Sequence, residues 1–83
     1  MIEPSVNARV LIEHIAKALV EKKDAVFLDE YEDGDETVIE LEVAEEDLGK
    51  VIGRSGRVAR ALRAVLSAVG TKTDKRYALE ILE

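Results

Sequence analysis

The sequence predicts an α+β domain with helices on one face of a β-sheet, and three observations support this fold class. Apolar residues recur at helical spacing in residues 5–22 and again in residues 57–69. Apolar and polar residues alternate over Thr37–Val43, as they do in a half-buried strand. The 83 residues, 47% of them apolar, suffice for one modest core. We therefore expect residues 1–83 to form a single domain.

The first predicted element is a helix over residues 5–22, entered at Pro4 and capped by Ser5 or Asn7. Its sole histidine, His14, has no second histidine or cysteine to share a metal, so we expect a surface position. One apolar row comprises Val6, Val10, Leu11, Ile15, Ala18 and Leu19. A second row comprises Ile12, Ala16 and Val20. Two rows make a wide apolar face, which serves either the core or a contact with another chain; the core is favoured.

A hairpin follows, with strands at Ala25–Glu32 and Thr37–Val43. The turn signal between them is Asp33-Gly34-Asp35. Acidic residues crowd the tip of this hairpin: Asp29, Glu30, Glu32, Asp33, Asp35 and Glu36. They lack the ligand order of a calcium-binding loop, so we expect a solvated turn and no metal.

The second half of the chain predicts a short helix at Glu45–Val51, a longer helix at 57–69 and a last strand at Lys75–Leu82. Gly70 is placed to terminate the longer helix. Tyr31 and Tyr77 either stack on bases or are buried. The element order is therefore αββααβ.

A tight Gly-x-x-Gly segment, from Gly53 to Gly56, stands directly before the longer helix. Glycine lacks Cβ and permits turns and close backbone approach that other residues do not. Such a loop at a helix start leaves N–H groups facing outward at the positive end of the helix dipole, which attracts phosphate. We therefore predict that the segment binds a nucleic-acid backbone. The predicted contact residues are Lys50, Ile52, Gly53, Arg54, Ser55, Gly56, Arg57 and Arg60.

The net charge of −6 argues against a nucleic-acid ligand until its distribution is considered. Residues 1–47 hold 15 acids and 4 bases, whereas residues 48–83 hold 8 bases and 3 acids. Between Leu48 and Thr73 there are six bases and no acid. Salt screens charges over about 8 Å, so local charge governs contact more than the total does. We expect the basic half to bind and the acidic half to restrict binding to one face; alternatively, both halves are only solvated surface.

The segment from Leu48 to Leu62, LGKVIGRSGRVARAL, resembles the core loop of KH domains. The match includes the isoleucine before the first glycine, a basic residue between the glycines and an arginine after the second. From Val6 to Leu82 the chain resembles the small bacterial single-KH-domain proteins of the KhpA type. This resemblance implies the type II KH fold: order αββααβ and a three-stranded mixed sheet with helices packed on one face.

The resemblance also implies a function, the binding of about four nucleotides of single-stranded RNA in a groove beside the loop. Gly53 to Gly56 would clamp the backbone, Ile52 and the 57–69 helix would support the bases, and an edge strand, Thr37–Val43, would form the opposite wall. A backbone clamp distinguishes RNA from DNA poorly, so single-stranded DNA stays open as a ligand.

Members of this group act as RNA chaperones or post-transcriptional regulators, often with a larger KH-containing partner. Effects on cell division, cell shape and cell-wall growth are attributed to them. The resemblance therefore implies a homodimer or a heterodimer with such a partner. One domain that contacts few nucleotides binds weakly, and pairing would raise its avidity.

Enzymatic function is disfavoured, because the chain has no cysteine, one isolated histidine and no P-loop sequence. We expect no catalytic residue and no cofactor. The sequence shows neither a signal-peptide pattern nor an apolar run of about 20 residues, which predicts a cytoplasmic protein away from membranes.

The main alternative is a protein–protein interaction module in which the acidic half and the first helix dock a partner and the glycine loop is only a structural turn. A pull-down with and without RNase would separate the two hypotheses. For RNA binding, we expect Gly53→Asp combined with Gly56→Asp to leave the fold intact and to abolish binding.

Overall fold

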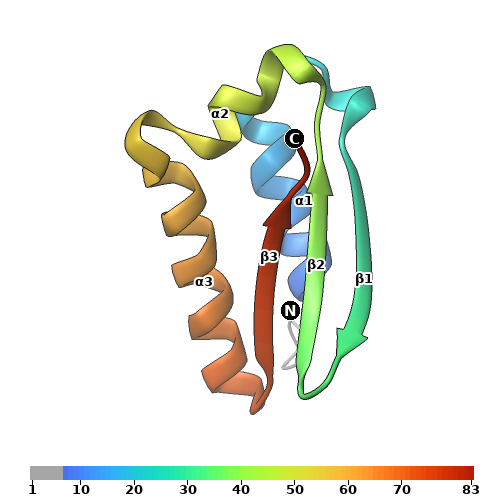
Figure 1. Cartoon of the computed structure of the whole chain (residues 1–83), viewed down its shortest axis with the longest axis vertical. Coiled ribbons are helices and arrows are strands. Elements are labelled where there is room, and N and C mark those ends of the chain that lie inside the picture. The colour runs from blue at the N-terminus through green and yellow to red at the C-terminus, as the bar shows by residue number, and fades with distance from the viewer. Residues whose placement is uncertain (1–6) are drawn as a thin grey trace, which may run out of the picture.

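The computed structural model describes residues 7–83, which form three helices and three strands in the order αββααβ (Figure 1). The helices are α1 (Ala8–Leu19), α2 (Leu48–Ile52) and α3 (Arg57–Thr73). The strands are β1 (Phe27–Asp33), β2 (Glu36–Glu42) and β3 (Arg76–Ile81). Short 3₁₀ turns connect them: η1 (Lys23–Ala25), η2 (Glu45–Asp47) and η3 (Arg54–Gly56). The predicted α+β class and the type II KH order are confirmed.

The sheet is mixed, because β1 pairs with β2 antiparallel and β3 pairs with β2 parallel. A two-residue turn closes the β1–β2 hairpin, and its first residue, Gly34, has a φ of +64° that glycine adopts without strain. The crossover from β2 to β3 runs through α2 and α3. It leaves β2 in the centre of the sheet, so the prediction that Thr37–Val43 forms an edge strand is wrong.

The core lies between the sheet and the helices, with α1 behind the sheet and α3 beside β3 (Figure 1). Ile39 and Leu41 of β2 are completely buried against Ile12 of α1. The apolar row Ile12, Ala16 and Val20 belongs to this core, as predicted. In the other row, Val10 and Leu19 stay 37% and 38% exposed. Leu11 and Ile15 of the same row pack half-buried against the core, so part of the wide apolar face of α1, including Val10 and Leu19, stays exposed.

The ends of α1 differ from the predicted 5–22 for local reasons. Asn7 caps the helix, because the Val10 N–H donates to its side-chain oxygen at 3.1 Å; Ser5 and Pro4 lie outside the described residues. Val20 adopts an extended backbone, with φ −96° and ψ 160°, which stops the helix after Leu19. His14 is exposed on α1, as expected.

The other boundaries move by a few residues. The first strand begins at Phe27 because Lys23–Ala25 forms a 3₁₀ turn, and the predicted helix Glu45–Val51 divides into η2 and α2. Gly70 does not end α3: the helix runs on to Thr73 and is capped by Asp74 in the left-handed conformation, φ +57°. Gly70 is buried, and a Cβ there would lie 2.4 Å from the Lys75 carbonyl oxygen. Glycine is needed because the chain entering β3 crosses the helix at this point.

We expect Gly70→Ala to destabilise the domain by about 1–3 kcal/mol, because the added methyl displaces the Lys75 backbone. The higher helix propensity of alanine offsets part of this cost. Gly49→Ala is the matched control, since a Cβ at Gly49 in α2 meets no atom within 4 Å; that variant should gain up to about 1 kcal/mol. Urea denaturation measures both, and equal effects of the two substitutions would refute the role assigned to Gly70.

Candidate nucleic-acid interface

The Gly-x-x-Gly segment forms a compact turn between α2 and α3 with three left-handed residues. Gly53, which follows α2, has φ +78°; Ser55 and Gly56 have φ +56° and +75°. The glycines adopt these angles without the steric cost that a Cβ brings. Ser55 carries that cost inside η3, and the chain then enters α3 at Arg57. The turn thus projects Arg54 and Ser55 outward, and both are exposed.

The two glycines are constrained differently. A Cβ at Gly53 would lie 2.7 Å from the Val58 backbone nitrogen and 2.5 Å from its side chain, whereas a Cβ at Gly56 would meet only the far end of Arg60, at 3.4 Å. Any side chain at Gly53 must therefore displace the start of α3. The expectation that Gly53→Asp with Gly56→Asp leaves the fold intact meets a steric conflict at Gly53, and charge substitutions at the arginines give a cleaner test.

Two amides of the turn are already used within it. The Gly56 N–H donates to the Gly53 carbonyl at 3.0 Å, and the Arg57 N–H donates to the Arg54 carbonyl. The Arg54 and Ser55 amides donate none of the backbone hydrogen bonds found around the turn. These two N–H groups lie just before the N-terminus of α3, where the helix dipole is positive. The turn therefore offers donors suited to an anion.

Arginines surround the turn without acidic partners. Arg54, Arg57 and Arg60 are exposed, and none takes part in an ion pair within residues 7–83. Arg60 reaches back so that its guanidinium donates to the Ser55 carbonyl at 2.8 Å. This bond braces the turn and holds one cation beside the unbonded amides.

Lys50, also a predicted contact residue, has a partner within the protein. Its ammonium lies 3.0 Å from the carboxylate of Asp47, which is completely buried. That carboxylate also accepts from the Glu21 and Lys22 amides, at 3.2 and 2.9 Å. These backbone bonds, led by Lys22, lower the pKa of Asp47 below its ordinary value, and Lys50 lowers it further. Asp47 thereby ties the segment after α1 to α2, which carries the turn.

A hollow of about 500 Å³ lies between the turn, α3 and β3. Three of the predicted contact residues line it: Ile52, Gly56 and Arg60. Lys50, Gly53, Arg54, Ser55 and Arg57 are not part of its lining. The wall facing the helix comes mainly from β3, at Ala78–Ile81, with Glu36 and Val38 of β2 behind it. Most of the wall is therefore formed by β3, the strand next to α3, and the predicted wall, Thr37–Val43, contributes Val38.

Sequence reasoning left Arg63 out of the contact residues. Its guanidinium donates to the Leu79 carbonyl at 3.2 Å and lines the hollow. The spacing of the arginines indicates this position: Arg63 follows Arg60 by three residues and so shares its helix face. The β3 residues of the wall carried no comparable signal.

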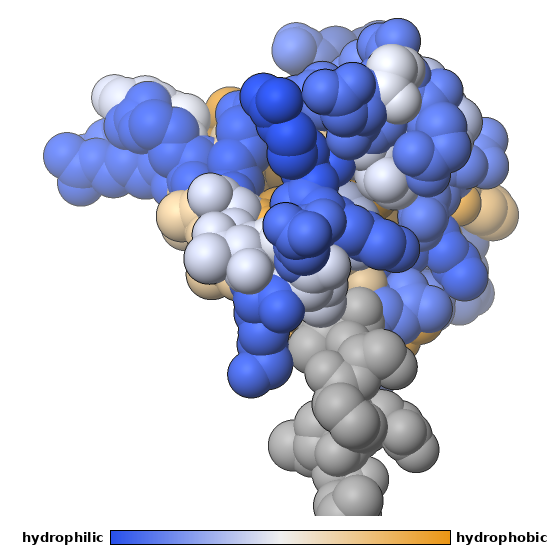
Figure 2. Space-filling model, turned by 90° about the horizontal axis from the view of Figure 1, so that it is seen from below, coloured by the Kyte–Doolittle hydropathy of each residue, from blue (hydrophilic) through white to orange (hydrophobic). Residues whose placement is uncertain are grey.

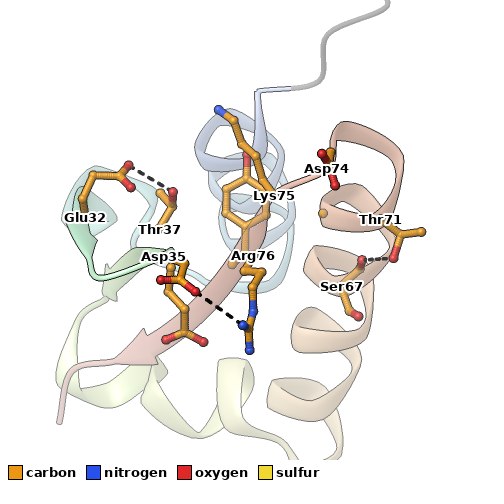
Figure 3. A pocket seen from close by; sticks show the side chains of 11 residues that line it. Glu32, Asp35, Thr37, Ser67, Thr71, Asp74, Lys75 and Arg76 are labelled. Atoms are coloured by element: carbon orange, nitrogen blue, oxygen red, sulfur yellow. Dashed lines mark hydrogen bonds and ion pairs between the residues drawn. The ribbon is translucent and has the colours of Figure 1, made fainter.

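A second hollow, of about 750 Å³, opens near the hairpin tip and the end of α3 (Figure 3). Its polar groups already bind one another: Thr37 donates to Glu32, Thr71 donates to the Ser67 carbonyl, and Arg76 pairs with Asp35. Seen from this end, the surface is mostly hydrophilic (Figure 2).

Within residues 7–83, no group of three or more acids or histidines is arranged to hold a metal ion. Nor does any helix in that range have the length and apolarity needed to cross a bilayer.

Comparison with known proteins identifies the family. The profile described as "KhpA/KhpB, KH domain" matches residues 9–81. The chain belongs to the KhpA/KhpB family of KH domains. Relatives named "RNA-binding protein KhpA" include one from Borreliella burgdorferi, 51% identical over 93% of this chain and 94% of the relative. Another, from Aquifex aeolicus, is 53% identical over 88% of this chain and 92% of the relative.

A third relative of the same name, from Halalkalibacterium halodurans, is 48% identical over 90% of this chain and 99% of its own length. No solved structure matches the chain significantly. The KhpA/KhpB family is one of RNA-binding domains and not of enzymes. The family match runs from the second residue of α1 to the end of β3.

Proposed function

We propose that this chain is a single KH domain that binds single-stranded RNA without catalysis, clamping about four nucleotides at the Gly53–Gly56 turn. The observation that carries the proposal is the pair of amides at Arg54 and Ser55, which donate no hydrogen bond within residues 7–83, beside exposed arginines that form no ion pair in that range. Backbone phosphate would contact the turn, and bases would lie in the hollow against Ile52 and β3. The relatives named as RNA-binding proteins support the choice of ligand.

The proposed contacts fall into two groups. Gly53, Arg54, Ser55, Gly56 and Arg57 form the clamp, together with Arg60. Ile52 and Arg63 lie deeper, where they would contact bases or sugars. Lys50 contributes mainly by holding Asp47, and its positive charge adds to the local field. The clamp would supply most of the affinity, because phosphate contacts dominate sequence-independent binding. These contacts position the strand without reading its sequence.

The role in the cell follows from the weakness expected of so small a contact. We propose that the protein acts as an RNA chaperone or post-transcriptional regulator together with a second KH-containing chain, since two linked sites gain avidity. Exposed apolar side chains, among them Val10 and Leu19 on α1 and Phe27 on β1, offer area for such pairing. Any effect on cell division or cell-wall growth would then be exerted through the bound RNAs, in the cytoplasm.

The test is the salt dependence of binding to a fluorescently labelled single-stranded RNA. Each phosphate contact on a single strand contributes about −0.7 to the slope of log K against log salt. Three to four contacts predict a slope between about −2 and −3. The same RNA in duplex form should bind more weakly, because the clamp needs a strand that enters the hollow. A slope near zero, or no binding at low salt, would contradict the proposal.

The alternative of a protein-docking module keeps support from the exposed apolar residues of α1 and β1. It predicts a stable complex with a protein that survives both RNase and substitution of the turn arginines. A complex that dissociates on RNase treatment would leave RNA binding as the function that the geometry supports.

A further inference from the structure

The sheet face turned away from the helices is acidic. Ile39 and Leu41 of β2 point into the core. Successive residues of a strand point to opposite faces, so Val38 and Glu40 point to the face away from the core. The register aligns Tyr31, Val38 and Ala78 in one row across that face. The adjacent row consists of acids only, namely Asp29, Glu40 and Glu80.

This acidic face continues into the hollow beside the turn. Glu80 and Ala78 of β3, together with Tyr31 and Val38, line the same hollow as Arg60 and Arg63. The hollow therefore has two electrically opposite sides. Its α3 side is basic and adjoins the proposed phosphate clamp, whereas its sheet side presents carboxylates.

Tyr31 is 43% exposed at the edge of this wall. Partial burial raises the pKa of its hydroxyl above the ordinary value, and the charges of Glu80 and Glu40 raise it further. The phenol thus stays neutral. Glu80 is exposed on the edge strand β3 and lines the hollow.

On the basis of the proposed function, we infer that this acidic wall, with Glu80 as its contact residue, determines which bases the hollow accepts. It repels phosphate and so turns the RNA backbone toward Arg54, Arg57 and Arg60. The base edges then face Glu80, which favours bases that carry an amino group. Adenine and cytosine are selected over uracil.

The selection follows from hydrogen-bond chemistry. An ionised carboxylate only accepts hydrogen bonds, so it needs a donor on the base edge. Cytosine offers its N4 amino group and adenine its N6 amino group, and glutamate is a known acceptor for the former. The single imide N–H of uracil is flanked by two carbonyl oxygens, which face the carboxylate with like partial charge. A uracil in the hollow therefore leaves Glu80 with the poorer partner.

The experiment measures the affinities of the full chain for hexamers of adenylate, cytidylate and uridylate at one salt concentration. The adenylate and cytidylate hexamers should bind at least about fivefold more tightly than the uridylate hexamer. This factor is the lower end of the discrimination that one specific base contact provides. Glu80→Gln should bring the three within about twofold of one another, because an amide both donates and accepts. Glu42→Gln is the matched control: it makes the same charge change on the same sheet face but outside the hollow.

Each outcome is decisive. A wild-type chain that binds all three hexamers equally would overturn the selection by Glu80 while leaving RNA binding in place. An equal effect of Glu42→Gln and Glu80→Gln would overturn it too, because it would show only general charge repulsion. Failure to bind any of the hexamers would overturn the proposed function and the base selection together. Preference for the amino-bearing bases, lost only in Glu80→Gln, would support both.

Discussion

Replacing Arg54 and Arg57 by glutamate should weaken binding of single-stranded RNA by at least about tenfold. Loss of one charge-assisted contact costs on the order of 1.4 kcal/mol, a factor of about ten. The two new carboxylates add repulsion of the phosphates. The salt slope should fall by about 0.7 for each phosphate contact that is lost. Fluorescence anisotropy with a labelled oligonucleotide, repeated at several salt concentrations, measures both quantities.

The fold should survive this double substitution. Arg54 and Arg57 are exposed and form no ion pair within the part of the chain that the structure describes. Arg57 is the first residue of α3, where an acid interacts favourably with the helix dipole. Circular dichroism and a thermal melt should therefore match those of the unmodified chain.

The matched control makes the same change of net charge at the other end of α3. Lys72 and Lys75 are both exposed and lie far along the chain from the turn. Lys72→Glu with Lys75→Glu should leave RNA affinity within about twofold if contact at the turn dominates, because charges beyond about 8 Å are screened at physiological salt. An equal loss in both double variants would show that the overall charge decides binding and would refute the clamp.

Replacing Asp47 by asparagine should lower the melting temperature by roughly 5–10 °C, the shift expected when buried partners lose their acceptor. The carboxylate is completely buried and accepts from two backbone amides and from Lys50. Asparagine has one acceptor oxygen: with its NH₂ group toward Lys22 that amide loses its partner, and in the flipped orientation the Glu21 amide and Lys50 lose theirs. Glu45→Gln, an exposed acid in the same 3₁₀ turn, is the matched control and should change little.

The effect of Asp47→Asn should also depend on pH in a defined direction. The pKa of Asp47 is lowered in the folded state, first by the Lys22 amide. Its stabilising contribution is therefore complete above the ordinary aspartate pKa of about 3.9 and is lost as the pH falls through the lower folded-state value. Thermal melts between neutral and strongly acidic pH should show the two chains converging at the acidic end. A difference that stays constant with pH would mean that the carboxylate charge contributes nothing.

Much of the site was predictable because its signals are local. Positive φ angles at Gly53 and Gly56 suit glycine, and the arginines around them appear in the sequence as a run of bases without acids. The alternation in β2 and the apolar rows of α1 are equally local. Each of these patterns reflects a constraint that acts within a few residues, so it can be read along the chain.

The errors concern contacts between distant residues. Gly70 looked like a helix terminator, but it is required by the Lys75 backbone that crosses it on the way to β3. The prediction that Lys50 contacts RNA stands, but no local pattern showed that it also pairs with a buried aspartate whose other partners lie 25 and 26 residues away. The strand Thr37–Val43 was predicted to be an edge strand and the whole wall of the hollow, but it is central and contributes Val38 beside β3, because the order of strands in a sheet is not encoded in any one strand.

The sequence by itself determined the classes of element, the position of the glycine turn and the concentration of positive charge around it. Only the tertiary structure decided that β3 faces α3, that Arg63 and Glu80 share one hollow, and that Asp47 is buried as a tie between two segments. The physical reason is that propensity, turn chemistry and charge density are properties of neighbouring residues. Which groups meet across the fold depends instead on how the crossover through α2 and α3 places β3 parallel to β2.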